Sequence, residues 1–119
     1  MATVRIQNLR LRTIIGANDW EREEKQDVVI NVTFEYDTSK AITSDQLKDT
    51  VDYRSLTKKI IKKVEASDFF LLEKLANMIL DTVMANHLIE KATVRVDKPF
   101  ALRFADSVSV ELQADRKNE

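Results

Sequence analysis

Apolar and polar residues alternate with a period of two near both ends of the chain, a pattern typical of strands with one buried face. In the first segment Val4 and Ile6 share one phase, but Leu9 and Leu11 share the other. The alternation therefore slips near Asn8, which predicts a strand with a β-bulge. Uninterrupted alternation predicts three further strands, at 27–36, 92–97 and 106–113.

The middle of the chain has the three-to-four-residue spacing of amphipathic helices. The segment 51–67 carries one apolar stripe, and the segment 70–87 carries a second. Asp52, at the start of the first segment, is a residue type that favours the N-cap of a helix. Both helices need an apolar surface to pack on, which the strands supply. The order ββααββ predicts an α+β fold with two helices on one face of a four-stranded antiparallel sheet.

The other face of that sheet is predicted to be polar, since Asn31, Thr33 and Glu35 face away from the apolar positions of their strand. Four strands still leave two open edges. Copies of the chain that close into a ring would cover those edges.

Composition narrows the class of protein. The 119 residues, 44% of them hydrophobic, suffice for one domain, which we expect to span 1–119. Nineteen basic and twenty acidic residues nearly cancel, which argues against nucleic acid or a membrane as partner. Without cysteine, and with His87 as the only histidine, a multi-ligand zinc site is not expected. His87 itself is read as a residue near a helix end, and a cytoplasmic location is the default.

Lys98 interrupts an apolar pattern. It falls in phase with Val94 and Val96, and the only proline of the chain follows it. Its aliphatic stem either covers the edge of the core or directs the ammonium group into a pocket. The loop of 17–26, with its acidic cluster, is longer than most hairpin connections and therefore a candidate for function.

Two other residues have a structural and a functional interpretation. Glu73 lies in the first turn of the second helix, where it is either an exposed flank residue or an anion that grips a pair of N–H donors. Tyr53 opens the first helix and is either a half-buried ring with a wet hydroxyl or a substrate contact. The pattern alone leaves both open.

Four spaced motifs, "IIGANDWEREEKQ", "DTVDYRSL", "LLEKLA" and "VDKPFALRFADSV", resemble the dihydroneopterin aldolase and dihydroneopterin triphosphate 2′-epimerase family over nearly the whole chain. "LRLRTIIG", "QDVVINV" and "DKPFALRFADSVSV" are more similar to the epimerase branch, whereas "GANDWE" is similar to the aldolase loop. The resemblance implies the tunnelling fold (T-fold), closed into a barrel by a homo-oligomer, a tetramer or octamer, with active sites between subunits.

The same resemblance implies the site residues and the ligand, a pterin. Glu73 would anchor the pterin ring, and Tyr53 would reach it from a neighbouring subunit. Glu21 and Lys98 would hold and work on the hydroxylated side chain, so catalysis would rest on Lys98, Tyr53 and Glu21. The remaining substrate-binding positions would be Leu72, Val51 and Ala17.

The implied reaction breaks the C1′–C2′ bond after the 2′-hydroxyl loses its proton, and the dihydropterin ring accepts the electrons. No metal or other cofactor is needed. If the aldehyde leaves, the enzyme is an aldolase; if it re-adds on its other face, the enzyme is an epimerase, the branch that we favour. Glu21 and Glu73 should favour the ammonium form of Lys98, so Lys98 acts either as the base or by holding a water or the alkoxide.

Two other classes remain as alternatives. A small α+β nucleic-acid module would use the lysine-rich helix, but it predicts a basic, aromatic strand face that this sequence lacks. A non-catalytic ring of the same fold would not need all four of Glu21, Tyr53, Glu73 and Lys98.

Overall fold

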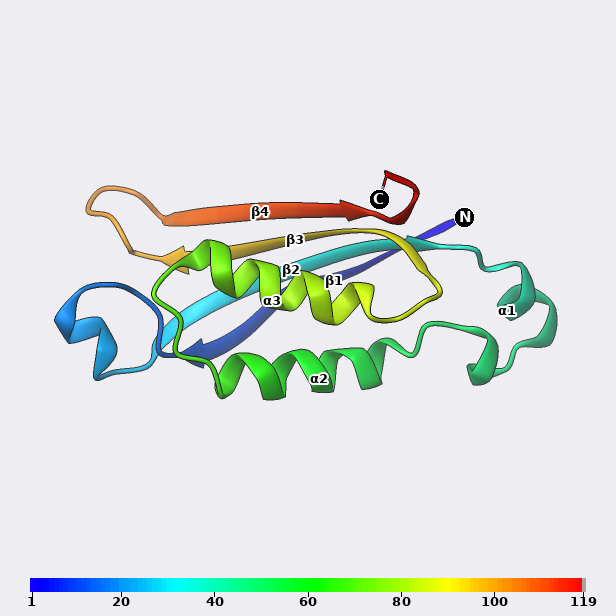
Figure 1. Ribbon diagram of the computed structural model, residues 1–119, viewed down its shortest axis with the longest axis horizontal. Coiled ribbons are helices and arrows are strands. Elements are labelled where there is room, and N and C mark those ends of the chain that lie inside the picture. The colour runs from blue at the N-terminus through cyan, green and yellow to red at the C-terminus, as the bar shows by residue number, and fades with distance from the viewer. Residues whose placement is uncertain (119) are drawn as a thin grey trace.

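The computed structural model describes residues 1–118 as an antiparallel four-stranded sheet with two long helices on one face (Figure 1). The sheet order β1-β2-β3-β4 follows the sequence, and both long helices lie between β2 and β3. This confirms the predicted α+β class and the ββααββ order. The main elements are β1 Ala2–Thr13, β2 Gln26–Tyr36, α2 Tyr53–Glu65, α3 Leu72–Met84, β3 Ile89–Pro99 and β4 Ser107–Asp115.

Short helical segments occur where the sequence pattern predicted only connections. They are a 3-10 helix at Asp19–Arg22, the helix α1 at Ser39–Ser44, and 3-10 turns at Leu47–Asp49 and Arg116–Asn118. Segments of one or two turns are too short for an apolar stripe to develop, so periodicity did not reveal them.

The predicted β-bulge is confirmed in β1. The pairing of β1 with β2 shifts register between Ile6 and Leu9, and Asn8 has a φ of 54°. Its backbone N–H donates to Asn31 Oδ1 at 2.9 Å, which provides this backbone donor with a partner on the neighbouring strand. The bulge therefore explains why the apolar positions change phase there.

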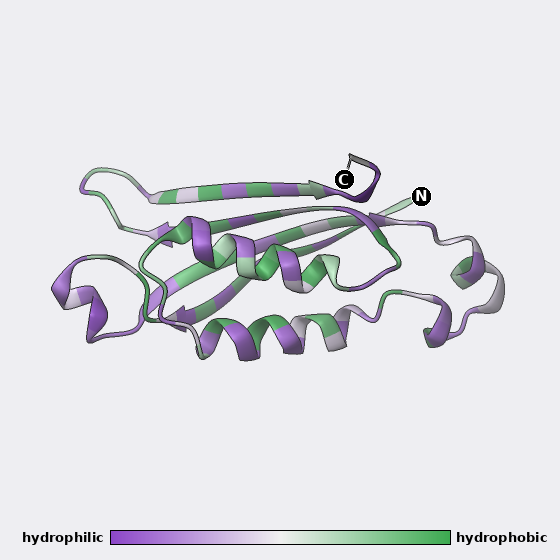
Figure 2. Ribbon diagram, viewed as in Figure 1, coloured by the Kyte–Doolittle hydropathy of each residue, from purple (hydrophilic) through white to green (hydrophobic). Residues whose placement is uncertain are grey.

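The core lies between the sheet and the two helices. Val32 and Val94 sit opposite each other on β2 and β3, both fully buried, and Ile60 of α2 and Ile79 of α3 are fully buried in the same core cluster. Burying an aliphatic side chain of this size stabilises the fold by about 1.5–3 kcal/mol. Figure 2 shows hydrophilic and hydrophobic residues alternating along β4, as one-sided packing requires.

The arrangement of the helices brings several loops to one end of the molecule. α2 begins behind Asp52, whose Oδ1 accepts a hydrogen bond from Ser55 N at 3.1 Å. The C-terminal end of α2, the start of α3, the loop after β1 and the β3–β4 loop all lie at one end of a molecule 52 Å long (Figure 1). The start of α2 lies toward the other end.

Within residues 1–118, β1 and β4 each have a strand neighbour on one side only. Their outer N–H and C=O groups are thus available to pair with another chain. In this part of the chain, no helix combines the length and apolar character needed to cross a bilayer.

Candidate active site

An ion pair between Lys98 and Glu21 marks the end of the molecule where the loops gather. Lys98 Nζ donates to Glu21 Oε2, and the two side chains are only 13% and 5% exposed. Lys98 is the penultimate residue of β3, and Glu21 lies in the 3-10 helix Asp19–Arg22. The in-phase lysine therefore directs its ammonium group at a buried carboxylate on the loop.

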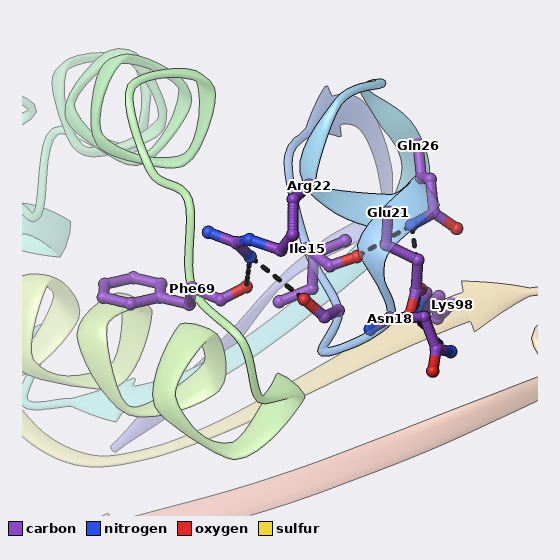
Figure 3. A network of polar contacts seen from close by, with 8 residues as sticks. Ile15, Asn18, Glu21, Arg22, Gln26, Phe69 and Lys98 are labelled. Carbon is purple, nitrogen blue, oxygen red and sulfur yellow. Dashed lines mark hydrogen bonds and ion pairs between the residues drawn. The ribbon is translucent and has the colours of Figure 1, made fainter.

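The Glu21 carboxylate has further donors on both oxygens (Figure 3). Oε1 accepts from the backbone N–H of Asn18 at 3.2 Å and from Asn18 Nδ2 at 2.9 Å. Oε2 accepts from Gln26 Nε2 at 3.0 Å, in addition to Lys98. This set of donors holds a charged group in one orientation at the base of the loop.

These contacts fix the charge of Glu21. Burial alone would raise the pKa of its carboxyl, but hydrogen bonds from Lys98, Gln26 and the Asn18 backbone together lower the pKa from 4.5 to about 2. Glu21 is therefore a carboxylate at neutral pH. The other acidic residues of the loop, Asp19, Glu23 and Glu24, are exposed, as a solvated cluster should be.

The only glycine lies directly against the Glu21 carboxylate. Gly16 has a φ of 129°, and a Cβ at this position would overlap the carboxylate carbon and both of its oxygens. The backbone conformation and the close approach both require glycine. The loop thus packs tightly around the charged pair.

Gln26 is a site residue that the sequence analysis missed. Its Nε2 donates to Ile15 O at 2.7 Å as well as to Glu21. Gln26 lies in phase with Val28, an inward-facing position of β2, so the same signal that singled out Lys98 could have found it. Ile15, by contrast, is 1% exposed and packs in the core.

Three other predicted site residues lie at the same end of the molecule. Leu72 and Glu73 form the first turn of α3, where Leu72 is half-buried and Glu73 is exposed. Ala17 is exposed in the loop that follows Gly16. The chain therefore places a free carboxylate, apolar side chains and the Lys98–Glu21 pair around one end of the sheet.

Tyr53 and Val51 lie elsewhere. Tyr53 is the first residue of α2, a helix of 13 residues, which places it about 18 Å from the last residue at a rise of 1.5 Å per residue. Tyr53 is 62% exposed, not half-buried, whereas Val51 is 2% exposed. Both line a hollow near the start of α2, together with Val4, Tyr36, Leu47 and Thr50.

The far end of α3 carries His87. This residue lies in an exposed turn between α3 and β3, whereas Lys98 is at the other end of β3. The structure thus keeps the only histidine away from the ion pair, as its reading as a helix-end residue implies.

Comparison with known proteins shows which family of sequences the chain is similar to. A family model described as dihydroneopterin aldolase matches residues 4–113. The chain is 49% identical over 115 residues to dihydroneopterin triphosphate 2′-epimerase of Escherichia coli K12, covering 97% of this chain and 96% of that protein. The Pseudomonas aeruginosa epimerase is 47% identical, covering 98% and 94%. Dihydroneopterin aldolase of Escherichia coli K12 is 28% identical, covering 95% and 93%.

Solved structures share the fold. A putative dihydroneopterin aldolase from Vibrio cholerae superposes with a TM-score of 0.92 at 29% identity, covering 98% of both chains. Dihydroneopterin aldolase of Escherichia coli in complex with neopterin superposes with a TM-score of 0.90 at 28% identity, covering 96% of this chain and 99% of that one.

Proposed function

Because the chain belongs to the dihydroneopterin aldolase family, we propose that it is a pteridine-processing enzyme that epimerises dihydroneopterin triphosphate at the 2′ carbon. The observation that carries the proposal is the buried Lys98–Glu21 pair, a charged acid–base couple at the open end of the sheet. Near-complete coverage of the epimerase relatives supports the same function.

The reaction needs one proton to leave the 2′-hydroxyl and one aldehyde to turn before it re-adds. Breaking the C1′–C2′ bond sends its electron pair into the conjugated C=N of the dihydropterin ring. With Glu21 ionised, we assign Lys98 as the ammonium that stabilises the alkoxide while a bound water carries the proton. Glu21 holds Lys98 in place and so acts on the side chain of the substrate through Lys98.

Glu73 is assigned to the pterin ring. An exposed carboxylate in the first turn of α3 is free to accept two parallel hydrogen bonds from the 2-amino and N3 edge of the ring. The positive end of the helix dipole favours its charge. Leu72 and Ala17 would then line the ring, close to the Lys98–Glu21 pair.

Tyr53 and Val51 are assigned to the same pocket but to a neighbouring subunit. The length of α2 separates Tyr53 from the Lys98 end of its own chain. The free edges of β1 and β4 would let copies pair edge to edge into a closed barrel, and a stagger between neighbouring copies would bring the start of α2 of one chain toward the Lys98 end of the next. We therefore propose a homo-oligomeric ring, a tetramer or a stacked octamer, with sites between subunits.

Cleavage is the second candidate. The aldolase of Escherichia coli, known in complex with neopterin, has the same fold at 28% identity, and both reactions pass through one intermediate. Dihydroneopterin aldolase activity, which releases glycolaldehyde and 6-hydroxymethyl-7,8-dihydropterin, therefore stays as the alternative. A cytoplasmic location and the absence of nucleic-acid and membrane partners stay predictions from composition.

The test compares two substrates. Purified protein is incubated with 7,8-dihydroneopterin and with its triphosphate, and the products are separated. We expect inversion of the triphosphate at 2′ to be faster than release of glycolaldehyde from the unphosphorylated substrate. Fast glycolaldehyde release without inverted product would make the protein an aldolase, and no turnover of either substrate would refute both assignments.

A further inference from the structure

Arg22 joins two segments that carry different parts of the proposed site. Its Nη1 atom donates to Gly16 O at 3.0 Å and to Phe69 O at 3.1 Å, and its Nη2 atom donates to Asp68 O at 2.5 Å. Figure 3 shows the Arg22 side chain reaching from the loop to the connector between α2 and α3. One acceptor therefore belongs to the loop of Arg22 itself, and the other two belong to the α2–α3 connector, up to 47 residues from Arg22 in the sequence.

The surroundings of the guanidinium distinguish it from an ordinary surface arginine. Its Cζ atom lies 3.9 Å from the centre of the Phe70 ring, a cation–π distance. None of the three ion pairs found within residues 1–118 includes Arg22. Its charge is met by backbone carbonyl dipoles and an aromatic face, an arrangement that needs the planar, five-donor guanidinium.

The two segments that Arg22 joins carry different residues of the proposed site. Arg22 directly follows Glu21, and Gly16 packs against the Glu21 carboxylate. On the other side, Phe69 and Phe70 precede the first turn of α3, which carries Glu73. A shift at this contact would change the separation between the Lys98–Glu21 pair and Glu73.

We infer that Arg22 is a positioning residue that sets the distance between the ring-binding carboxylate and the ion pair that acts on the substrate side chain. The inference rests on the proposed function. Glu73 would bind the pterin ring, and Lys98 with Glu21 would act at the 2′ carbon, two bonds away from the ring. Loosening of the Arg22 contact should therefore misplace the reacting bond without removing the contact between Glu73 and the ring. Misplacement of about 1 Å is enough to lower a rate by about 10²-fold.

The experiment compares Arg22→Ala and Arg22→Lys with the wild type and with Arg12→Ala. Arg12 is a matched control because Arg12 Nη2 also donates to a backbone carbonyl of the same loop, Lys25 O at 2.9 Å, but it does not reach the α2–α3 connector. Turnover of 7,8-dihydroneopterin, to cleaved and inverted products together, is measured per folded protein. Binding of unsubstituted pterin is measured by calorimetry, and exchange of the amide hydrogens of 67–72 by mass spectrometry.

We expect kcat to fall by about 10- to 100-fold in both Arg22 variants, with the Kd for pterin changed by less than about threefold. Lysine should not rescue, because one ammonium cannot replace the planar fork of donors. Exchange of 67–72 should be faster than in Arg12→Ala. Wild-type kcat in both Arg22 variants, or full rescue by lysine, would overturn the inference.

Failure of the proposed function would look different. Wild-type protein would then turn over neither 7,8-dihydroneopterin nor its triphosphate, and the exchange comparison alone would decide whether Arg22 holds the connector. Unchanged exchange in both Arg22 variants would refute the positioning role in that case. If Arg22→Ala does not fold, Arg22→Lys, which keeps the charge and the aliphatic stem, carries the same test.

Discussion

Lys98 Nζ and Glu21 Oε2, from residues 77 positions apart in the sequence, form an ion pair at the end of the sheet. The pair brings the last part of β3 onto the loop that precedes β2. It fixes both the charge of the carboxylate and the direction of the ammonium group. The proposed chemistry depends on this relationship, and so do the first two predictions.

Replacement of Lys98 by alanine should lower cleavage and inversion by about 10²-fold or more, the scale expected for a positioned acid–base group. Binding of unsubstituted pterin should stay within about a factor of ten, because Glu73 is assigned to the ring. Steady-state kinetics and calorimetry measure the two effects. Lys63→Ala, on an exposed position of α2, is the control. Near wild-type turnover in Lys98→Ala would remove Lys98 from the reaction.

Glu21 should make stability depend on pH in the acid range. Its pKa in the folded protein, about 2, lies below the ordinary value of 4.5, so its contribution is present above pH 4.5 and is lost as the pH falls toward 2. The shift corresponds to about 3 kcal/mol. Denaturant unfolding of wild type and Glu21→Gln should show a stability difference that shrinks across this window. A difference that stays constant from pH 5 to pH 2 would contradict the prediction.

Gly16→Ala should destabilise the protein by about 1–3 kcal/mol, because the added Cβ meets a strained backbone and the Glu21 carboxylate. Turnover should fall as well, since the carboxylate must move away from Lys98. Thermal and denaturant unfolding measure the first effect, and kinetics the second. Ala66→Gly, at the exposed C-cap of α2, is a control for a small residue change outside the loop. Unaltered stability in Gly16→Ala would show that the loop relaxes freely.

Glu73→Gln should weaken pterin binding by about 2–4 kcal/mol, because an amide replaces one acceptor with a donor that faces donors on the ring. Stability should barely change, because Glu73 is exposed. Calorimetry with unsubstituted pterin measures the affinity. Asp81→Asn, an exposed acid farther along α3, controls for loss of charge. Wild-type affinity in Glu73→Gln would place the ring elsewhere.

Tyr53 should act on the site of a neighbouring chain. Tyr53→Ala and Lys98→Ala subunits, each inactive alone, are dissociated, mixed and reassembled. We expect activity to return, because some sites then combine an intact Tyr53 with an intact Lys98. Verified mixed rings that stay inactive would mean that each site draws both residues from one chain.

The sequence predicts most of the fold because periodicity reports one-sided burial directly. The strands, the bulge at Asn8 and both long helices follow from that signal. Polar residues in phase with buried positions were informative too: Lys98 was found this way, and Gln26 could have been.

The rest depends on contacts that sequence spacing does not encode. Nothing in an acidic loop distinguishes Glu21, which becomes buried, from its exposed neighbours Glu23 and Glu24. Arg22 is equally indistinct, since its acceptors are backbone carbonyls available in any sequence. Only the way the loop closes on β3 and on the α2–α3 connector selects these two residues.

The separation of Tyr53 from Lys98 along the molecule has a consequence for mixed populations of chains. In the proposed ring each subunit contributes one end to each of two neighbouring sites. A subunit damaged at one end therefore spoils one site and completes another, so total activity falls in direct proportion to the damaged fraction. A subunit damaged at both ends spoils two sites, and total activity follows the square of the intact fraction.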